Sequence, residues 1–312
     1  MIGIVIVTYE SERDIEYCLR SIAYLTHIPY ELVIVDNGSN DSTVAITQAT
    51  LDCFDDSSCQ RVQPVFLSDN TGYAPAINRG FELLSSDTQH IVFLNPDTIV
   101  SEKWLQRLRG RFKDKVGIVG PLSDTTAGFQ KITYWLDGID IVEHEALRYE
   151  AGTDIQHFAQ GIAQHFAGQT AQVKFISGFC LMTSRSIIEE LGALNNSFYL
   201  GIDDLEFCLR VRSAGYDLCV ACDVFVYHRG GSSILSFPRK QYQQLHKQMG
   251  AHFCSLLTEQ YNGAIPSSDE LFGFTLFDPR EFAPGAPYPS LQWQEKLVSL
   301  DGQTLVKMRE LA

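Results

Sequence analysis

Carboxylates in this chain stand where apolar strands are expected to end. The run Ile91–Leu94 is followed directly by Asn95-Pro96-Asp97. Ligand sites in open α/β sheets form outside the carboxyl ends of the strands, and Mg²⁺ is often held by one or two carboxylates together with phosphate oxygens. The tripeptide therefore predicts a metal site with Asp97 as a ligand, although Asn, Pro and Asp are also common turn residues.

Two further acids, Asp203 and Asp204, stand at the start of a helix predicted over Asp204–Ala214. A positioned carboxylate can act as a general base that takes a proton from an attacking hydroxyl. The same residues also have a structural interpretation, because Asp203 and Glu206 fit a helix capping box and acids in a first turn are favoured by the helix dipole. Their spacing alone does not separate the two interpretations.

These side chains need a sheet that brings them together, and the first half of the chain predicts one. Apolar runs alternate with helical periodicities, which indicates a parallel sheet with helices on both faces. The carboxyl ends of its strands, at Thr8, Asp36, Leu67 and Leu94, would share one edge. The predicted strands are 2–8, 31–36, 62–67 and 91–94, and the predicted helices are 15–25, 43–49 and 74–84.

The second half of the chain has a weaker pattern. Residues 120–172 are expected to be irregular, as a lid or an acceptor-side insertion. An apolar strand is predicted over Val173–Met182, interrupted by Ser177-Gly178. Helices are predicted over 184–191, 204–214 and 239–261, and residues 264–312 are not placed.

The composition limits the partners of such a site. The chain has 312 residues and a formal net charge of -14, which argues against nucleic-acid binding. An acidic protein that binds phosphate must supply local positive charge, for which a divalent cation or helix N-termini are the simplest sources. The N-terminus reads as a first strand and no apolar run approaches about 20 residues, so a cytoplasmic protein is expected.

The eight cysteines follow no framework spacing. Cys219 and Cys222 form a lone CxxC, which we expect to pack as small apolar residues of a strand and not to bind zinc. A disulfide between Cys53 and Cys59 is not expected in a reducing cytosol.

Besides Asn95-Pro96-Asp97, the chain carries the segments VIVTYE (5–10), ELVIVDNGSNDST (31–43), NTGYAPAINRG (70–80), IDDLEFCLR (202–210) and VYHRGGSS (226–233). The order and spacing of these segments resemble a family 2 glycosyltransferase with a GT-A fold, over roughly residues 2–233. The resemblance implies an α/β fold with a Rossmann-like, mostly parallel central sheet and helices on both faces. It further implies a catalytic domain over 1–235, with a nucleotide-binding half (1–120) and an acceptor and catalytic half (121–235), followed by a helical and irregular extension (236–312).

The resemblance also implies residue roles. Asp203 would be the base in preference to Asp204, which would orient the site or bind acceptor hydroxyls. Family members usually carry Asp-x-Asp at the metal site, and here Asn95 replaces the first acid. The cofactor would be Mn²⁺ or Mg²⁺, with a histidine ligand favouring Mn²⁺. The implied nucleotide-binding residues are Thr8, Tyr9, Glu10, Asp36, Asn70, Gly72, Asn78, Arg79 and Asn95, the acceptor-binding residues are Ser177, Gly178 and Phe179, and the metal ligands are Asp97 and His228.

The implied activity is an inverting transfer of a sugar from a nucleotide diphosphate sugar to a hydroxyl of a saccharide or lipid-linked acceptor, in cell-surface polysaccharide synthesis. Asn-Pro-Asp is common in the rhamnosyltransferase-like branch, and Asp-Asp-x-Glu resembles the galactofuranosyltransferase branch. The donor would be dTDP-rhamnose or a UDP-sugar. A lipid-linked acceptor would bring the enzyme to the inner face of the cell membrane, and a homodimer is compatible with this interpretation.

Three alternatives remain. A non-catalytic or regulatory nucleotide-sugar-binding protein is favoured by the missing first acid at Asn95. A nucleotidyltransferase should carry a basic, Gly-rich loop after the first strand, but residues 8–12 are acidic there, and no GxGxxG follows that strand. A glycoside hydrolase also uses two carboxylates, but it would not need the nucleotide-site motifs. Arg79 fits a phosphate contact or a solvated helix arginine about equally.

Overall fold

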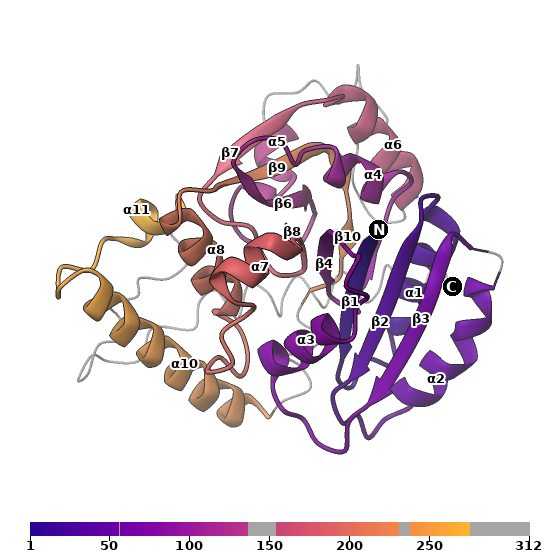
Figure 1. The fold of residues 1–312 in the computed structure, drawn as a ribbon, viewed down its shortest axis with the longest axis horizontal. Helices are drawn as coiled ribbons and strands as arrows, with labels where there is room; N and C mark the ends of the chain where they lie inside the picture. The colour runs from indigo at the N-terminus through magenta and orange to yellow at the C-terminus, as the bar shows by residue number, and fades with distance from the viewer. Residues whose placement is uncertain (56, 137–153, 231–237, 275–312) are drawn as a thin grey trace.

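The computed structural model describes residues 1–55, 57–136, 154–230 and 238–274 (Figure 1). Its strands are β1 Ile2–Thr8, β2 Tyr30–Asp36, β3 Cys59–Phe66, β4 His90–Leu94, β5 Thr98–Ile99, β6 Val116–Leu122, β7 Thr170–Val173, β8 Cys180–Ser184, β9 Asp217–Phe225 and β10 Tyr227–His228. Its α-helices are α1 Ile15–Leu25, α2 Thr43–Thr50, α3 Tyr73–Glu82, α4 Trp104–Arg109, α5 Thr133–Leu136, α6 Ile155–His165, α7 Arg185–Leu191, α8 Asp203–Ser213, α10 Arg239–Gln260 and α11 Ser268–Phe272. Two 3₁₀ turns are η1 Leu51–Phe54 and η2 Gly128–Gln130.

Within the described ranges the main sheet has eight strands in the order β3-β2-β1-β4-β8-β6-β9-β7, and β5 pairs with β10 in a small separate ribbon. β1 runs parallel to β2 and β4, β2 to β3, and β6 to β9. β8 is antiparallel to β4 and β6, and β7 is antiparallel to β9. The expected mostly parallel α/β sheet is confirmed, and the antiparallel strands β7 and β8 make it mixed.

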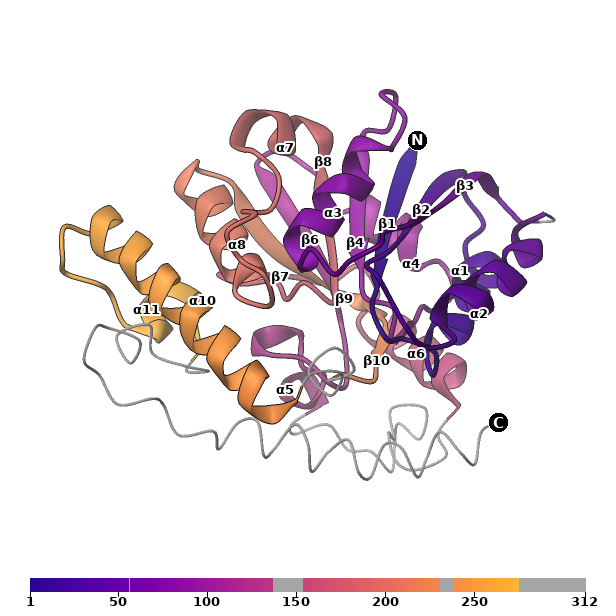
Figure 2. The same cartoon turned by 90° about the horizontal axis from the view of Figure 1, so that it is seen from below.

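Strand β1 shows why helices cover both faces. Every residue of β1 is buried, as expected for a strand covered on both sides. Val5 and Val7 belong to the apolar cluster that includes α3, whereas Ile4 and Ile6 belong to the cluster that includes α1. A Cβ at Gly80 of α3 would lie 2.3 Å from a methyl of Val5, so the close approach of this helix requires glycine. Figure 2 shows α3 on one side of β1 and β2, with α1 and α2 on the other.

The strands predicted over 2–8, 31–36, 62–67 and 91–94 are confirmed as β1 to β4. Thr8 lies opposite Asp36 in the sheet register, so the carboxyl ends of β1 and β2 meet at one edge. The six predicted helices are confirmed as α1, α2, α3, α7, α8 and α10, with ends within two residues. Cys219 and Cys222 are buried in β9 as expected, and Cys53 and Cys59 are free thiols.

The single strand predicted over Val173–Met182 is wrong. β7 ends at Val173 on the edge of the sheet, and β8 begins at Cys180 near its centre. The chain between them turns because backbone amides at 177 and 178 donate to side chains of other segments and not to a neighbouring strand. The interruption at Ser177-Gly178 marks this crossing, with apolar residues on both sides of it.

The irregular segment predicted over 120–172 is wrong for part of its length. Residues 155–165 form α6, which buries Phe158 and Ile162 against the sheet. The carboxylate of Asp154 caps this helix by accepting from the amides of Gln156 and His157. Residues 137–153 lie outside the described residues, so the expected lid is not tested there.

The C-terminal part of the described chain adds α10 and α11, which lie at the opposite end of the molecule from α2 in both views (Figures 1 and 2). Phe253 and Leu257 of α10 join the apolar cluster that includes α8. Within the described ranges, no helix combines the length and apolar composition that a membrane span requires. Two parts of the predicted segments lie outside the described residues. They are the end of the motif VYHRGGSS, within 231–237, and the end of the expected extension, 275–312.

Candidate active site

The β5–β10 ribbon brings the two predicted metal ligands together. β10 pairs antiparallel with β5, so that His228 lies opposite Thr98, directly after Asp97. The amide of Arg229 donates to the carbonyl of Asp97 at 2.9 Å. As a result Nε2 of His228 lies 3.3 Å from Oδ1 of Asp97. Two residues distant in sequence therefore form one polar pair beside the end of β4.

The ring of His228 has a fixed orientation. Its Nδ1 lies 2.6 Å from the carbonyl of Thr125, which can only accept, so Nδ1 carries a proton. The ring stacks on Phe179 with centroids 4.8 Å apart. Burial lowers the pKa of His228, but the charge and hydrogen bond of Asp97 outweigh burial and raise the pKa overall. In the neutral form, Nε2 would present its lone pair toward Asp97.

The two predicted acids, Asp203 and Asp204, are the first residues of α8 and follow a residue with a strained backbone. Ile202 precedes the helix with φ of 71°, a left-handed conformation that a β-branched residue rarely adopts. Such strain costs on the order of 1–3 kcal/mol and is found at functional sites. Ile202 is the N-cap and no side chain caps the helix, while Glu206 pairs with Arg210 at 2.8 Å. The capping-box interpretation of Asp203 and Glu206 is therefore wrong.

The two acids have different surroundings. Asp204 accepts from the amide of Gly178 at 2.9 Å and from that of Leu205 at 2.8 Å. Burial raises the pKa of Asp204, and these amides oppose the rise. Asp203 is 4% exposed, and burial followed by the charge of Asp204 raises its pKa well above the usual range. A raised pKa strengthens a carboxylate as a base.

The predicted acceptor turn at 177–179 lies between the acid pair and the turn 95–97. Gly178 contacts Asp204, and the amide of Asn95 donates to the carbonyl of Phe179 at 2.8 Å. The amide of Ser177 donates to Oε1 of Gln130 at 2.6 Å. Gln130 is fully buried and donates in turn to the carbonyl of Pro121. Sequence reasoning missed Gln130, because no local pattern marks a glutamine that orders a distant turn.

A second group of polar side chains lies at the carboxyl ends of β1 and β2. Oδ1 of Asp36 accepts from Thr8 Oγ1 at 2.8 Å and from Ser39 Oγ at 2.6 Å. The amide of Glu10 donates to Ser39 Oγ, and the Glu10 carboxylate accepts from the amide of Asn40. Thr8, Glu10 and Asp36, with Tyr9 between the first two, thus lie together as predicted. Asp36 also organises its own loop, because its carboxylate accepts from the amide and the hydroxyl of Ser39.

The loop before α3 is fixed by contacts within the chain. Oδ1 of Asn70 accepts from Asn37 Nδ2 and from the amide of Gly72, both at 2.9 Å. Gly72 has φ of 95°, and a Cβ there would lie 2.8 Å from the ring of Tyr199. The positive φ and the close contact both favour glycine at this position. The segment that approaches this glycine closely is the Tyr199 loop.

The other two predicted nucleotide contacts on α3 are engaged within the protein, Asn78 with another segment and Arg79 with its own helix. Nδ2 of Asn78 donates to the carbonyl of Leu194 and to Asn196 Oδ1, both at 2.7 Å. Arg79 pairs with Glu82 at 3.2 Å on the exposed face of the helix. Neither contact involves the turn 95–97 or the acid pair. The contact of the Arg79 guanidinium with the exposed Glu82 favours the interpretation of Arg79 as a solvated helix arginine.

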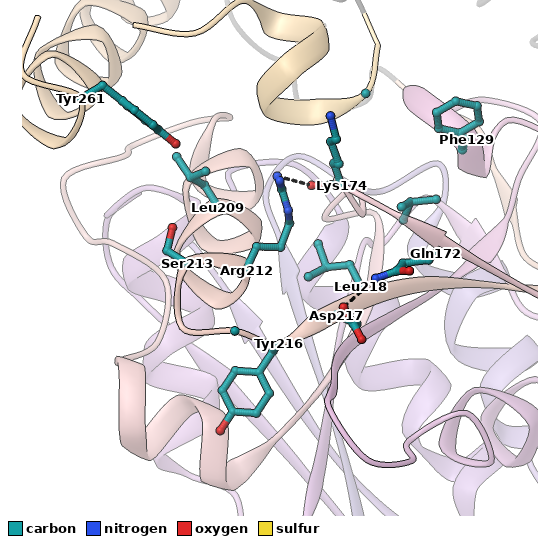
Figure 3. Close-up of a pocket in the computed structure, with 13 residues that line it drawn as sticks. Phe129, Gln172, Lys174, Leu209, Arg212, Ser213, Tyr216, Asp217, Leu218 and Tyr261 are labelled. Atoms are coloured by element: carbon teal, nitrogen blue, oxygen red, sulfur yellow. Dashed lines mark hydrogen bonds between the residues drawn. The ribbon is translucent and has the colours of Figure 1, made fainter. Parts of the chain in front are cut away.

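A cavity of about 690 Å³ lies apart from these residues, at the opposite end of α8 (Figure 3). Nη1 of Arg212 donates to the carbonyl of Lys174, and Nζ of Lys174 donates to the carbonyls of Asp269 and Glu270 in α11. These cations hold the short helix α11 against the sheet. None of the predicted site residues lines this cavity, so we do not place the active site there.

The architecture is that of the GT-A class of nucleotide-sugar transferases: a mixed, mostly parallel sheet with polar turns gathered at the carboxyl ends of its strands. The chain belongs to glycosyl transferase family 2, whose model matches residues 3–192.

The chain is similar to glycosyltransferases of the archaeon Haloferax volcanii. It is 25% identical over 229 residues to Glycosyltransferase AglE, covering 73% of this chain and 66% of that protein. It is 25% identical over 217 residues to the low-salt glycan biosynthesis hexosyltransferase Agl10, covering 68% of this chain and 61% of that protein. The chain thus spans about two thirds or less of the length of these relatives.

Two solved structures share the fold. The mannosyltransferase PcManGT of Pyrobaculum calidifontis, in complex with GDP-Man and Mn²⁺, has a TM-score of 0.55 and 17% identity, covering 85% of this chain and 65% of that one. GalNAc-T7 with UDP, GalNAc and Mn²⁺ has a TM-score of 0.57 and 14% identity, and the match covers 97% of this chain and 54% of that chain. The protein is a glycosyltransferase homologue with a GT-A-like fold.

Proposed function

We propose that this protein is an inverting, metal-dependent glycosyltransferase that moves a sugar from a nucleotide diphosphate to a hydroxyl acceptor. The observation that carries the proposal is the position of the acceptor turn, which contacts Asp204 through Gly178 and Asn95 through Phe179. This turn joins the acid pair to the Asp97–His228 pair. A base and a site for the leaving diphosphate are the two parts that such a transfer needs.

The donor atoms of Asp97 and His228 fit a divalent cation. In the described residues no group of three or more His, Cys, Asp or Glu gathers around one point, so these two residues would hold the ion together with diphosphate oxygens. The Thr125 carbonyl orients His228 as buried ligand histidines are usually oriented. When bound, Mn²⁺ or Mg²⁺ would offset the charge that develops on the departing diphosphate. The GDP-Man and UDP complexes of the two structural neighbours both contain Mn²⁺.

We assign the general base to Asp203. Asp204 is engaged by two backbone amides and is better suited to hold the acceptor turn. Asp203 would take the proton from the acceptor hydroxyl as that oxygen attacks the anomeric carbon from the face opposite the diphosphate. A single displacement of this kind inverts the anomeric configuration.

We place the nucleotide at the ends of β1 and β2, in the half 1–120, and the acceptor in the half 121–235, with 236–312 as an extension. Thr8, Tyr9, Glu10 and Asp36 would contact the base or ribose, with Asn70, Gly72 and Asn95 bordering the same site. Asn78 and Arg79 are better explained by their bonds to the 194–196 loop and to Glu82.

For the donor we propose dTDP-rhamnose or a UDP-sugar, and for the acceptor a saccharide or lipid-linked saccharide of a cell-surface glycan. The names of the relatives, a hexosyltransferase of glycan biosynthesis among them, support a glycan product. A lipid-linked acceptor would place the enzyme at the cytoplasmic face of the membrane as a peripheral protein, and a homodimer is compatible with this arrangement.

Release of nucleoside diphosphate from a panel of UDP-, dTDP- and GDP-sugars tests the proposal. We expect release from one donor with Mn²⁺ or Mg²⁺ and none with EDTA, since slow hydrolysis proceeds without an acceptor. Nucleotide binding without release, with or without a saccharide acceptor, would support the non-catalytic binding protein. Release that EDTA does not affect would contradict the metal site.

A further inference from the structure

Tyr73 lies at the junction of the two halves of the site, although neither the acid pair nor the metal pair includes it. It is the first residue of α3, directly after Gly72. Its hydroxyl lies 3.3 Å from Oδ1 of Asn95 and 3.5 Å from the carbonyl oxygen of Gly178. The first contact belongs to the turn that carries Asp97, and the second to the turn that binds the acid pair.

The two contacts share a single proton. Both partners are acceptors, and both distances exceed the roughly 2.7–2.8 Å usual for hydroxyl-to-oxygen bonds. The phenol remains a donor, because burial and the charges of Asp203, Asp204 and Asp97 raise its pKa well above the ordinary value. Tyr73 is therefore a neutral donor among carboxylates.

The hydroxyl completes a chain of contacts across the site. Asp204 accepts from the amide of Gly178, and the carbonyl of Gly178 faces Tyr73. On the other side, Nδ2 of Asn95 lies 3.5 Å from Nε2 of His228. One path from Asp204 to His228 thus runs through the Tyr73 hydroxyl, beside the backbone contact of Phe179 with Asn95.

An ordinary structural role does not account for this hydroxyl. The start of α3 is already fixed by the backbone, because the amide of Tyr73 donates to the carbonyl of Tyr199 at 2.7 Å. Asn37 Nδ2 donates to the carbonyl of Gly72 at 3.1 Å. The loop therefore keeps its supports when the hydroxyl of residue 73 is removed.

We propose that Tyr73 is a positioning residue whose hydroxyl couples the metal pair Asp97–His228 to the acceptor turn 177–179. The proposal rests on the proposed glycosyltransferase function. By donating to Asn95 Oδ1, the hydroxyl holds this amide with its nitrogen toward His228. By facing Gly178, it holds the acceptor turn at a set distance from the metal pair. The substitution of Asn95 for the usual first acid gives the hydroxyl an amide oxygen as its acceptor.

The test compares Tyr73→Phe with Tyr199→Phe. Each variant removes one hydroxyl from the same region, but among the described contacts that of Tyr199 donates to the backbone carbonyl of Asn70 and reaches neither the turn 95–97 nor the turn 177–179. For Tyr73→Phe we expect kcat to fall about 10-fold at saturating Mn²⁺, with the donor KM within about twofold, the size of effect that one neutral hydrogen bond gives. We expect Mn²⁺ to bind several-fold more weakly, in titrations of Mn²⁺ alone and with UDP. Tyr199→Phe should change each quantity by less than about twofold.

A double-mutant cycle shows whether Tyr73 acts through Asn95. In an Asn95→Ala background, Tyr73→Phe should weaken Mn²⁺ binding much less than it does in the wild type, because the acceptor is already gone. Additive effects, or equal losses in Tyr73→Phe and Tyr199→Phe, would overturn the proposal. The Mn²⁺ titration needs no turnover, so it tests the coupling even if the wild type releases no nucleotide. A wild-type protein that releases no nucleotide would contradict the proposed function and would leave the coupling through Tyr73 to be decided by the Mn²⁺ titration.

Discussion

Replacing Asp203 with asparagine is expected to lower kcat for sugar transfer by about 1,000-fold while nucleotide binding persists. Asparagine has nearly the same shape but cannot accept the proton of the acceptor hydroxyl, and general-base catalysis typically contributes 10²–10⁴-fold. The measurement is nucleoside diphosphate release by Asp203→Asn beside the wild type, with binding of the same nucleotide measured by titration.

The stability of Asp203→Asn separates lost chemistry from misfolding. Burial and Asp204 raise the folded-state pKa of Asp203. Its contribution to stability is therefore present at low pH and is lost as pH rises through that raised pKa. Above that raised pKa the wild type bears a buried charge that asparagine lacks, so the variant should there have an equal or higher Tm, by a margin that shrinks as pH falls.

The matched control for this variant is Glu206→Gln, which removes a carboxylate from the same turn of α8. Glu206 pairs with Arg210 and touches neither the acceptor turn nor the metal pair in the contacts described. We expect its activity to stay within a few-fold of wild type. Equal losses of kcat in Glu206→Gln and Asp203→Asn would contradict the assignment of Asp203 as the base. They would mean that activity depends on the negative charge at this end of α8.

Replacing His228 with alanine should lower kcat/KM for the donor by at least about 100-fold at low Mn²⁺. The change removes one of two protein ligands, and a catalytic metal contributes several kcal/mol of transition-state stabilisation. Asp97 and the diphosphate remain, so a higher Mn²⁺ concentration should restore part of the activity. The measurement is kcat/KM as a function of Mn²⁺ concentration.

His157→Ala is a suitable control for this second prediction, since His157 is an exposed residue of α6. It should leave the Mn²⁺ dependence of kcat/KM unchanged. If His228→Ala kept the wild-type response to Mn²⁺, His228 would be a structural residue that packs on Phe179 and nothing more.

The parts of the fold that follow from local pattern were predictable. β1 is a run of buried β-branched residues covered on both faces, and its pattern needs no tertiary information. Thr8 and Asp36 end neighbouring parallel strands, so their meeting follows from strand polarity alone. The helix α6 was missed although Ile155, Phe158, Ala159 and Ile162 recur at helical spacing, so its pattern is present in the sequence.

The contacts that assemble the site could not be read from local pattern. Asp97 and His228 come from distant parts of the chain and meet through the β5–β10 ribbon, so the prediction that they act together rested on resemblance to a family. Gln130 and Tyr73 act on turns in other segments, and nothing in their neighbouring residues marks this. Apolar residues on both sides of Ser177-Gly178 favoured one strand over 173–182, whereas these two residues belong to the turn that binds Asp204.

The central claim is a single displacement at the anomeric carbon, with Asp203 as base, and the anomeric configuration of the first product tests it most directly. Time-resolved proton NMR of the sugar that wild-type protein releases to water, from the donor that the panel identifies, gives this configuration before mutarotation. We predict the anomer opposite to that of the donor. Retention of configuration would contradict the account, because it would require a covalent or front-face mechanism in which Asp203 is not a simple base.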